Sequence, residues 1–122
     1  MASGDILDLF TGRNSTTDVV RVQMQKSATS YQIRSGLLND AGTWTDTNWF
    51  DISNNRTAVE IQYQAFANSG SLTLWLDNVH KQSLTFIDND VHTLTDSPKC
   101  KLHLTNLFFY CCKGRVRLIL TK

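Results

Sequence analysis

Residues 57–90 read TAVEIQYQAFANSGSLTLWLDNVHKQSLTFIDND, and apolar side chains alternate with polar ones through most of this stretch. A period of two is typical of a β-strand with one buried face and one solvated face. The alternation is interrupted at residues 67–70 and at Asp77-Asn78, where side chains that favour turns are gathered. We therefore expect three successive antiparallel strands at 57–66, 71–76 and 79–86, the last two joined by a tight hairpin turn.

The composition of the 122-residue chain favours an all-β fold in a single domain. It contains 14 Thr, 10 Ser and 9 Asn but only 6 Ala and a single Glu, so strand and turn formers far outnumber helix formers. Turn clusters recur at intervals of about 8–12 residues, which is the spacing of a β-sandwich. Further strands are expected at residues 5–10, 19–24, 31–38, 49–53, 101–104 and 115–120, with turns at 12–15, 26–30, 39–42 and 53–55.

Residues 99–122 differ from the rest of the chain in charge and cysteine content. Residues 1–98 carry six Lys or Arg and eleven Asp or Glu, a net charge of −5, whereas residues 99–122 carry six Lys or Arg and no acidic residue, a net charge of +6. All three cysteines lie in this basic tail, and an odd number of cysteines indicates no closed disulfide framework.

The order of the segments is similar to that of bacterial LamG-like modules in the concanavalin A-like lectin/glucanase superfamily. The strand V-E-I-Q-Y-Q, an Asn/Ser/Gly loop, G-S-L-T-L-W-L-D-N, a return strand and D-N-D follow one another as in that family. Segments near residues 1–5, 19–22, 30–37 and 43–50 extend the likeness upstream, so the resemblance covers about residues 1–96 and fades in the tail.

The resemblance implies an antiparallel jelly-roll sandwich spanning residues 1–122, with closing strands that are incomplete or altered. It also implies an extracellular or cell-surface location, although no signal peptide and no membrane-spanning apolar run is visible in the sequence. We expect residues 108–120 to fold back as a substitute strand pair with a turn at Lys113-Gly114, which would cover an otherwise open sheet edge. Pairing with a second copy through that incomplete edge is the alternative.

The outward face of the expected sheet is the candidate ligand-binding site. Amide and guanidinium groups can form paired hydrogen bonds with neighbouring sugar hydroxyls, and an indole can stack on the C–H face of a sugar ring. We expect one ligand-binding face on adjacent strands, directed at a glycan or a surface protein, with no catalytic residues. Its candidate residues are Gln23, Gln32, Arg34, Gln62, Gln64 and Trp75.

The corner Asp88-Asn89-Asp90 offers three side-chain oxygens in a short span, which is the ligand type that calcium prefers. The same residues also form corners by hydrogen-bonding their own backbone, so a structural turn is the competing interpretation. We expect no cofactor, with calcium at this corner as the alternative.

Three other functional classes remain as alternatives. A structural or assembly fragment of a larger surface protein would take its missing strands from a partner. A glycosidase would need two facing carboxyl groups, and Glu60 is the only glutamate, with Gln62 and Ala65 where glucanase relatives carry further acidic residues. Nucleic-acid binding would depend on the basic tail, whose charges also fit the solvated face of an ordinary strand.

Overall fold

The computed structural model describes residues 4–52, 56–93, 99–100, 107–112 and 115–120. Within these residues every regular element is a β-strand, as the composition predicts. The strands are β1 (Ile6–Asn14), β2 (Thr17–Lys26), β3 (Tyr31–Leu38), β4 (Trp44–Asp46), β5 (Phe50–Ile52), β6 (Thr57–Gln64), β7 (Gly70–Leu76), β8 (Val79–Ile87), β9 (Lys99–Cys100), β10 (Leu107–Cys112) and β11 (Arg115–Leu120). Among the same residues, none belongs to a helix that could span a lipid bilayer.

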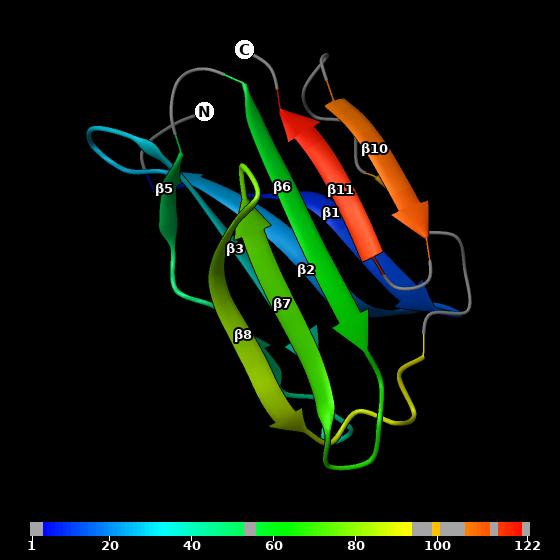
Figure 1. Ribbon diagram of the computed structural model, residues 1–122. Coiled ribbons are helices and arrows are strands. Elements are labelled where there is room, and N and C mark those ends of the chain that lie inside the picture. Colours follow the sequence, from blue (N-terminus) through cyan, green and yellow to red (C-terminus); the bar gives the residue numbers. More distant parts are fainter. Residues whose placement is uncertain (1–3, 53–55, 94–98, 101–106, 113–114, 121–122) are drawn as a thin grey trace.

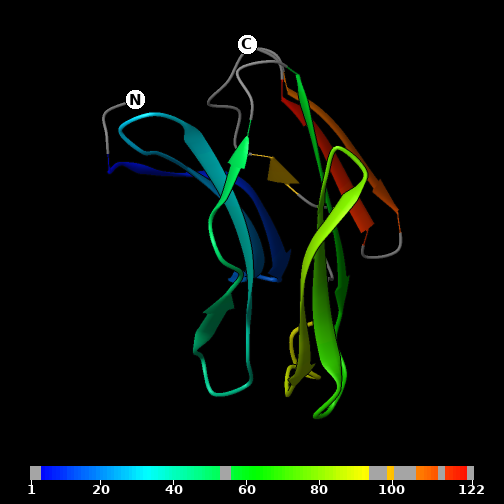
Figure 2. The same cartoon turned by 60° about the vertical axis from the view of Figure 1, so that its left-hand side comes forward.

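The strands form two antiparallel sheets that pack as a sandwich (Figure 1). The first, called here the β2 sheet, has the order β4-β3-β2-β1-β9, and β5 also pairs with β3. The second, the β6 sheet, has the order β10-β11-β6-β7-β8. Figure 2 shows the two sheets as separate layers, with β1 to β5 in one and β6, β7, β8, β10 and β11 in the other.

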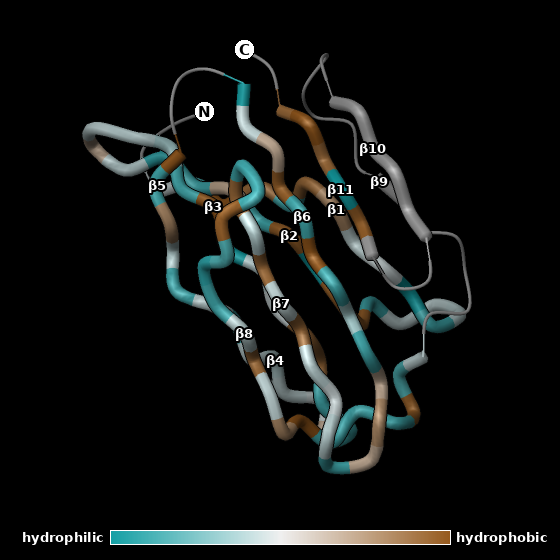
Figure 3. The backbone as a smooth tube through the Cα atoms, viewed as in Figure 1, coloured by the Kyte–Doolittle hydropathy of each residue, from teal (hydrophilic) through white to brown (hydrophobic). Residues whose placement is uncertain are grey.

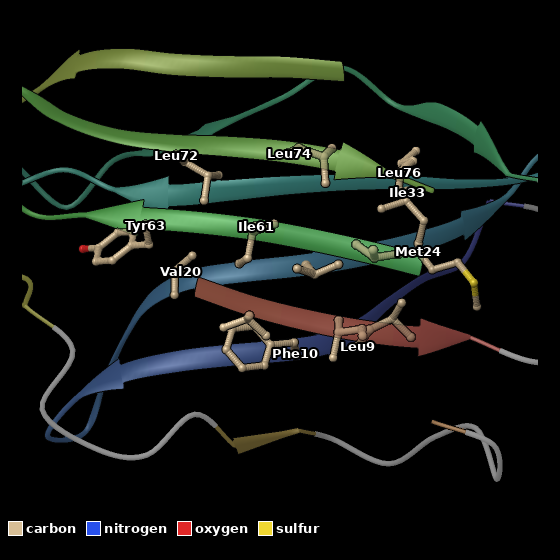
Figure 4. Packing of buried hydrophobic residues seen from close by; sticks show 14 of the residues in the cluster. Leu9, Phe10, Val20, Met24, Ile33, Ile61, Tyr63, Leu72, Leu74 and Leu76 are labelled. Carbon is tan, nitrogen blue, oxygen red and sulfur yellow. The ribbon is translucent and has the colours of Figure 1, made fainter. Parts of the chain in front are cut away.

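One hydrophobic cluster fills the space between the sheets (Figure 4). The alternation seen in the sequence is reproduced along β6 and β7, whose odd and even positions are buried in turn, and Figure 3 shows the matching change of hydropathy along these strands. The apolar positions of the alternating pattern in both sheets lie in this core, with exposed fractions of at most 1%: Val20, Val22, Ile33, Val59, Ile61, Leu72 and Leu74.

The tail contributes to this core as expected. Strand β11 pairs antiparallel with β6, and its residues Val116, Leu118 and Leu120 are buried. Strand β10 pairs in turn with β11, so the two form the expected strand pair within one chain. The predicted turn at Lys113-Gly114 lies outside the described residues.

The hairpin turn between β7 and β8 is also confirmed. Asp77 and Asn78 have φ angles of 50° and 67°, the left-handed conformation that a two-residue hairpin turn requires. The Asp77 carboxylate accepts a hydrogen bond from the Ala58 amide, 2.8 Å away, which ties the turn to the start of β6.

Several predicted boundaries are wrong. Strand β1 continues to Asn14 through the predicted turn at 12–15, because its pairing with β2 persists past a register shift after Gly12. Strand β4 lies in a segment where no strand was predicted and is held by pairing with the end of β3. The chain forms a short strand at Lys99–Cys100, whereas the predicted strand at 101–104 lies outside the described residues.

Candidate ligand-binding faces

The six candidate ligand residues do not form one surface. Strands β2 and β3, which carry Gln23, Gln32 and Arg34, belong to the β2 sheet, while β6 and β7, which carry Gln62, Gln64 and Trp75, belong to the β6 sheet. Because the inner faces of both sheets meet at the core, their outer faces point in opposite directions. The expectation of a single face on adjacent strands is therefore wrong, and the residues divide into two groups of three.

On the outer face of the β2 sheet, the candidate residues are already engaged with one another. Gln23 is only 7% exposed; its amide donates to Asp8 over 2.8 Å and accepts from Arg34 over 2.9 Å. The Arg34 guanidinium also lies 4.4 Å from the ring centroid of Trp49. Such a series of contacts is typical of a sheet face whose polar side chains form hydrogen bonds with one another.

Gln32 is engaged in the same way. It accepts a hydrogen bond from Gln25 over 2.8 Å and donates one to Asp51 over 2.9 Å. On this face, the side chains that were expected to contact a ligand thus form hydrogen bonds with side chains of neighbouring strands.

A second stack on this face was not predicted from the sequence. The Arg21 guanidinium lies 4.1 Å from the ring centroid of Trp44 and makes hydrogen bonds to both carboxylate oxygens of Asp46. Asp46 stands opposite Gly36 on β3, where a Cβ would lie 1.9 Å from the Asp46 carboxylate, so only glycine leaves room for this ion pair. The cross-strand register that brings Arg21, Gly36 and Asp46 together has no local signal in the sequence.

The outer face of the β6 sheet, called here the Trp75 face, is arranged differently. It consists of cross-strand rows of polar residues around one partly exposed indole. Trp75 stands between Glu60 on β6 and His80 on β8, with its ring 6.5 Å from the His80 ring at an interplanar angle of 73°. This face includes Glu60, Gln62, Gln64, Ser71, Thr73, Trp75, His80 and Ser83, together with Arg117 of β11, which stands opposite Glu60.

The next row of the Trp75 face supplies hydroxyl and amide groups. Thr73 Oγ1 lies 3.2 Å from Ser83 Oγ, which in turn lies 2.9 Å from His80 Nε2. Gln62 stands beside Thr73, and its amide makes no side-chain hydrogen bond to another described residue. In the following row, the Gln64 side-chain oxygen accepts a long contact of 3.5 Å from the Ser71 hydroxyl.

The corner at residues 88–90 is part structural and part acidic. Asn89 is completely buried: its Oδ1 accepts from the Phe66 amide over 3.1 Å, and its Nδ2 donates to the Gln64 carbonyl over 3.2 Å and to the Tyr63 hydroxyl over 3.4 Å. With these bonds formed, its side chain is turned away from any surface ion. The expectation that Asn89 is a calcium ligand is contradicted, and its role is that of a structural turn.

Asp88 and Asp90 flank this buried asparagine and lie at the surface. A third carboxylate, that of Asp40 in the loop after β3, joins them, and the nearest oxygens of the three lie within 4.8 Å of one another. The backbone bond from the Asp40 amide to the Asp88 carbonyl, 2.8 Å, holds the two loops together. Asp40, Asp88 and Asp90 are thus the residues that could hold a calcium ion, and calcium binding itself stays a prediction.

The three carboxylates influence one another. A hydrogen bond between the side chains of Asp40 and Asp90 raises the pKa of Asp40 and lowers that of Asp90, and the negative charge of Asp88 raises the pKa of Asp40 further. Opposed shifts of this kind are typical of closely spaced carboxyl groups joined by a hydrogen bond.

Comparison with protein-family models, with curated proteins and with solved structures finds no match for this chain. The geometry of the faces is therefore the basis of the functional argument.

Proposed function

We propose that the chain is a non-catalytic carbohydrate-binding module of the LamG-like, jelly-roll kind, and that its ligand lies across the Trp75 face. The observation that carries the proposal is the partly exposed Trp75 indole, which lies in one cross-strand row with Glu60 and His80 and next to a row of amide and hydroxyl groups. Sugar rings present an apolar C–H face and a rim of hydroxyls, so they need an aromatic plate beside hydrogen-bonding groups.

The groups next to Trp75 suit sugar hydroxyls. The Gln62 amide offers a donor and an acceptor that no other described side chain occupies, and the Thr73 hydroxyl stands beside it. When a sugar stacks on Trp75, its hydroxyls would replace the water molecules bound to Gln62 and Thr73. Both side chains are uncharged, so this replacement does not require the desolvation of a charge.

The opposite face is the weaker choice for the same ligand. Gln23, Gln32 and Arg34 form hydrogen bonds within the protein, and a sugar would have to break those bonds before it could use the groups.

A glycan array probed with the full chain tests the proposal. Trp75→Ala should abolish the signal while leaving the thermal unfolding midpoint nearly unchanged, because the indole contributes to a surface and not to the core. Trp44→Ala is the matched control, since it removes a partly exposed tryptophan from the opposite face and should leave glycan binding intact.

Two results would refute the proposal. Glycan binding that survives Trp75→Ala would show that the face is merely solvated. Binding that disappears when calcium is chelated, but not with Trp75→Ala, would move the site to Asp40, Asp88 and Asp90.

A further inference from the structure

Phe86 combines an exposed aromatic side chain with an unfavourable backbone conformation. Its side chain is 84% exposed, the most of any large hydrophobic residue among those described, and its φ angle is 60°. A left-handed conformation is a marked outlier for a bulky residue, and it occurs here in the irregular stretch of β8 opposite Ser71. Strain that persists at an exposed aromatic residue is a reason to look for a function at that point.

Two further exposed apolar residues lie at the same end of the sandwich. Phe66, in the loop after β6, is 53% exposed, and Val91, in the loop after β8, is 60% exposed. Figure 1 places the ends of β6 and β8 and the loops that follow them together at the lower end of the molecule. The two loops are joined because the Asn89 backbone amide donates to the Phe66 carbonyl over 3.3 Å, and the Phe66 backbone amide donates to the Asn89 side-chain oxygen over 3.1 Å. We call this region, made up of residues 39–43, 65–69 and 86–93, the loop end.

The loop end also carries concentrated negative charge. Its carboxylates Asp40, Asp88 and Asp90 lie within 4.8 Å of one another, and none of them forms an ion pair among the described residues. The ion pairs that are described lie on β1, β2, β3 and β4. Apolar side chains and carboxylates without a described ion pair therefore lie at the same end of the sandwich.

The loop end is held rigidly enough to act as a binding surface. The buried side-chain amide of Asn89 holds the loop after β8 against the end of β6. The Tyr63 hydroxyl holds the same loop by donating a hydrogen bond to the His92 carbonyl. His92 Nε2 lies 2.9 Å from the Asn39 carbonyl, so the loop after β3 is tied into the same frame. A surface that is ordered before binding loses little conformational entropy on binding.

We infer that the loop end docks a positively charged segment of a partner protein whose apolar side chains cover Phe86 and Phe66. A bound segment needs apolar side chains to cover the exposed apolar residues of the loop end. It needs Lys or Arg to complement the charge of the three carboxylates. A membrane fits less well, because anionic headgroups would repel the carboxylates at the point of contact. The site is distinct from the Trp75 face and does not depend on the function proposed for it.

Selection of a phage-displayed library of random dodecapeptides on the full 122-residue chain tests the inference. The enriched peptides should combine Lys or Arg with Leu, Phe or Trp, and synthetic versions should bind more weakly as sodium chloride is raised from about 50 to about 500 mM. Phe86→Asn should weaken their binding by roughly tenfold or more. Its thermal midpoint should be unchanged or higher, since asparagine tolerates positive φ better than phenylalanine does.

Matched variants separate this surface from others. Val79→Asn replaces another exposed apolar residue, 55% exposed, at the other end of β8 and should leave peptide binding unchanged. Asp88→Asn with Asp90→Asn should weaken binding about three- to tenfold and reduce its salt dependence. Trp75→Ala should have no effect on the peptides, whatever it does to glycans.

Four results would overturn the inference: no enriched peptide, enrichment of acidic peptides, binding that is unaffected by Phe86→Asn, or binding that is unaffected by the double aspartate variant. Sedimentation of the chain with phosphatidylcholine vesicles, lost in Phe86→Asn, would also overturn it and assign the apolar residues to a lipid surface.

Discussion

Replacing Gly70 with alanine tests how tightly the loop end is packed against the sheet. Gly70 begins β7 and lies against the buried Asn89 side chain; a Cβ at this position would stand 1.7 Å from Asn89 Oδ1 and 2.5 Å from its Cγ. These distances are far inside van der Waals contact, so the Asn89 amide or the strand must shift.

The cost follows from the bonds that such a shift would break. Asn89 Oδ1 is 3.1 Å from the Phe66 amide, and Nδ2 is 3.2 Å from the Gln64 carbonyl. Leaving a buried polar group unsatisfied costs roughly 1–3 kcal/mol. With one or two such groups affected, Gly70→Ala should lower the free energy of unfolding by about 2–4 kcal/mol.

Urea denaturation followed by tryptophan fluorescence and by circular dichroism measures this cost. A double-mutant cycle with Asn89→Ala isolates its cause, because removal of the amide also removes the clash. In the Asn89→Ala background, Gly70→Ala should cost about 1 kcal/mol or less. A loss below about 0.5 kcal/mol in the wild-type background, or equal losses in the two backgrounds, would refute the packing argument.

Three further predictions concern the core, the tail and the pH range of stability. Ile61→Asp should unfold the protein, because it places an unpaired carboxylate in the core, whereas Gln62→Asp on the outer face should unfold at nearly the wild-type urea concentration; equal losses would contradict the register of β6. Deletion of residues 99–122 should give an aggregating product, because it removes core side chains of β11 and leaves β6 unpaired on one edge, and a soluble, monomeric, cooperatively folding remainder would disprove this. Burial raises the pKa of Tyr63 to about 12 from its ordinary value of 10.0, so the unfolded state releases the phenolic proton first and stability should fall as pH rises between these values. In chemical denaturation at several pH values, Tyr63→Phe should lack that part of the decline, and an identical decline in both proteins would count against the buried hydroxyl.

Structural features that depend only on residues close together in the sequence were predictable from the sequence. The period of two in β6 and β7 assigned their inward side chains correctly, because successive side chains of a strand must point to opposite faces. The hairpin turn at Asp77-Asn78 was predictable for a similar reason, since aspartate and asparagine tolerate the positive φ angles that the turn requires.

The tail strand β11 could also be expected from its alternation and from the open edge that it covers. That β11 pairs with β6, however, depends on an interaction between strands that are far apart in the sequence. The irregular stretch of β8 that places Phe86 in a left-handed conformation is likewise set by pairing with β7 and has no signature in the residues around it.

The arrangement of the candidate sites required the tertiary structure. Local alternation shows that Arg34 and Trp75 both point away from the core, but it cannot show that their strands belong to different sheets and face opposite sides of the molecule. Nor can it show that Asp40 reaches Asp88 and Asp90, or that Asn89 between them turns inward to satisfy buried backbone groups. Strand periodicity is a property of the local backbone, whereas these contacts depend on which strands pair and how the two layers stack, and so on interactions between residues far apart in the chain.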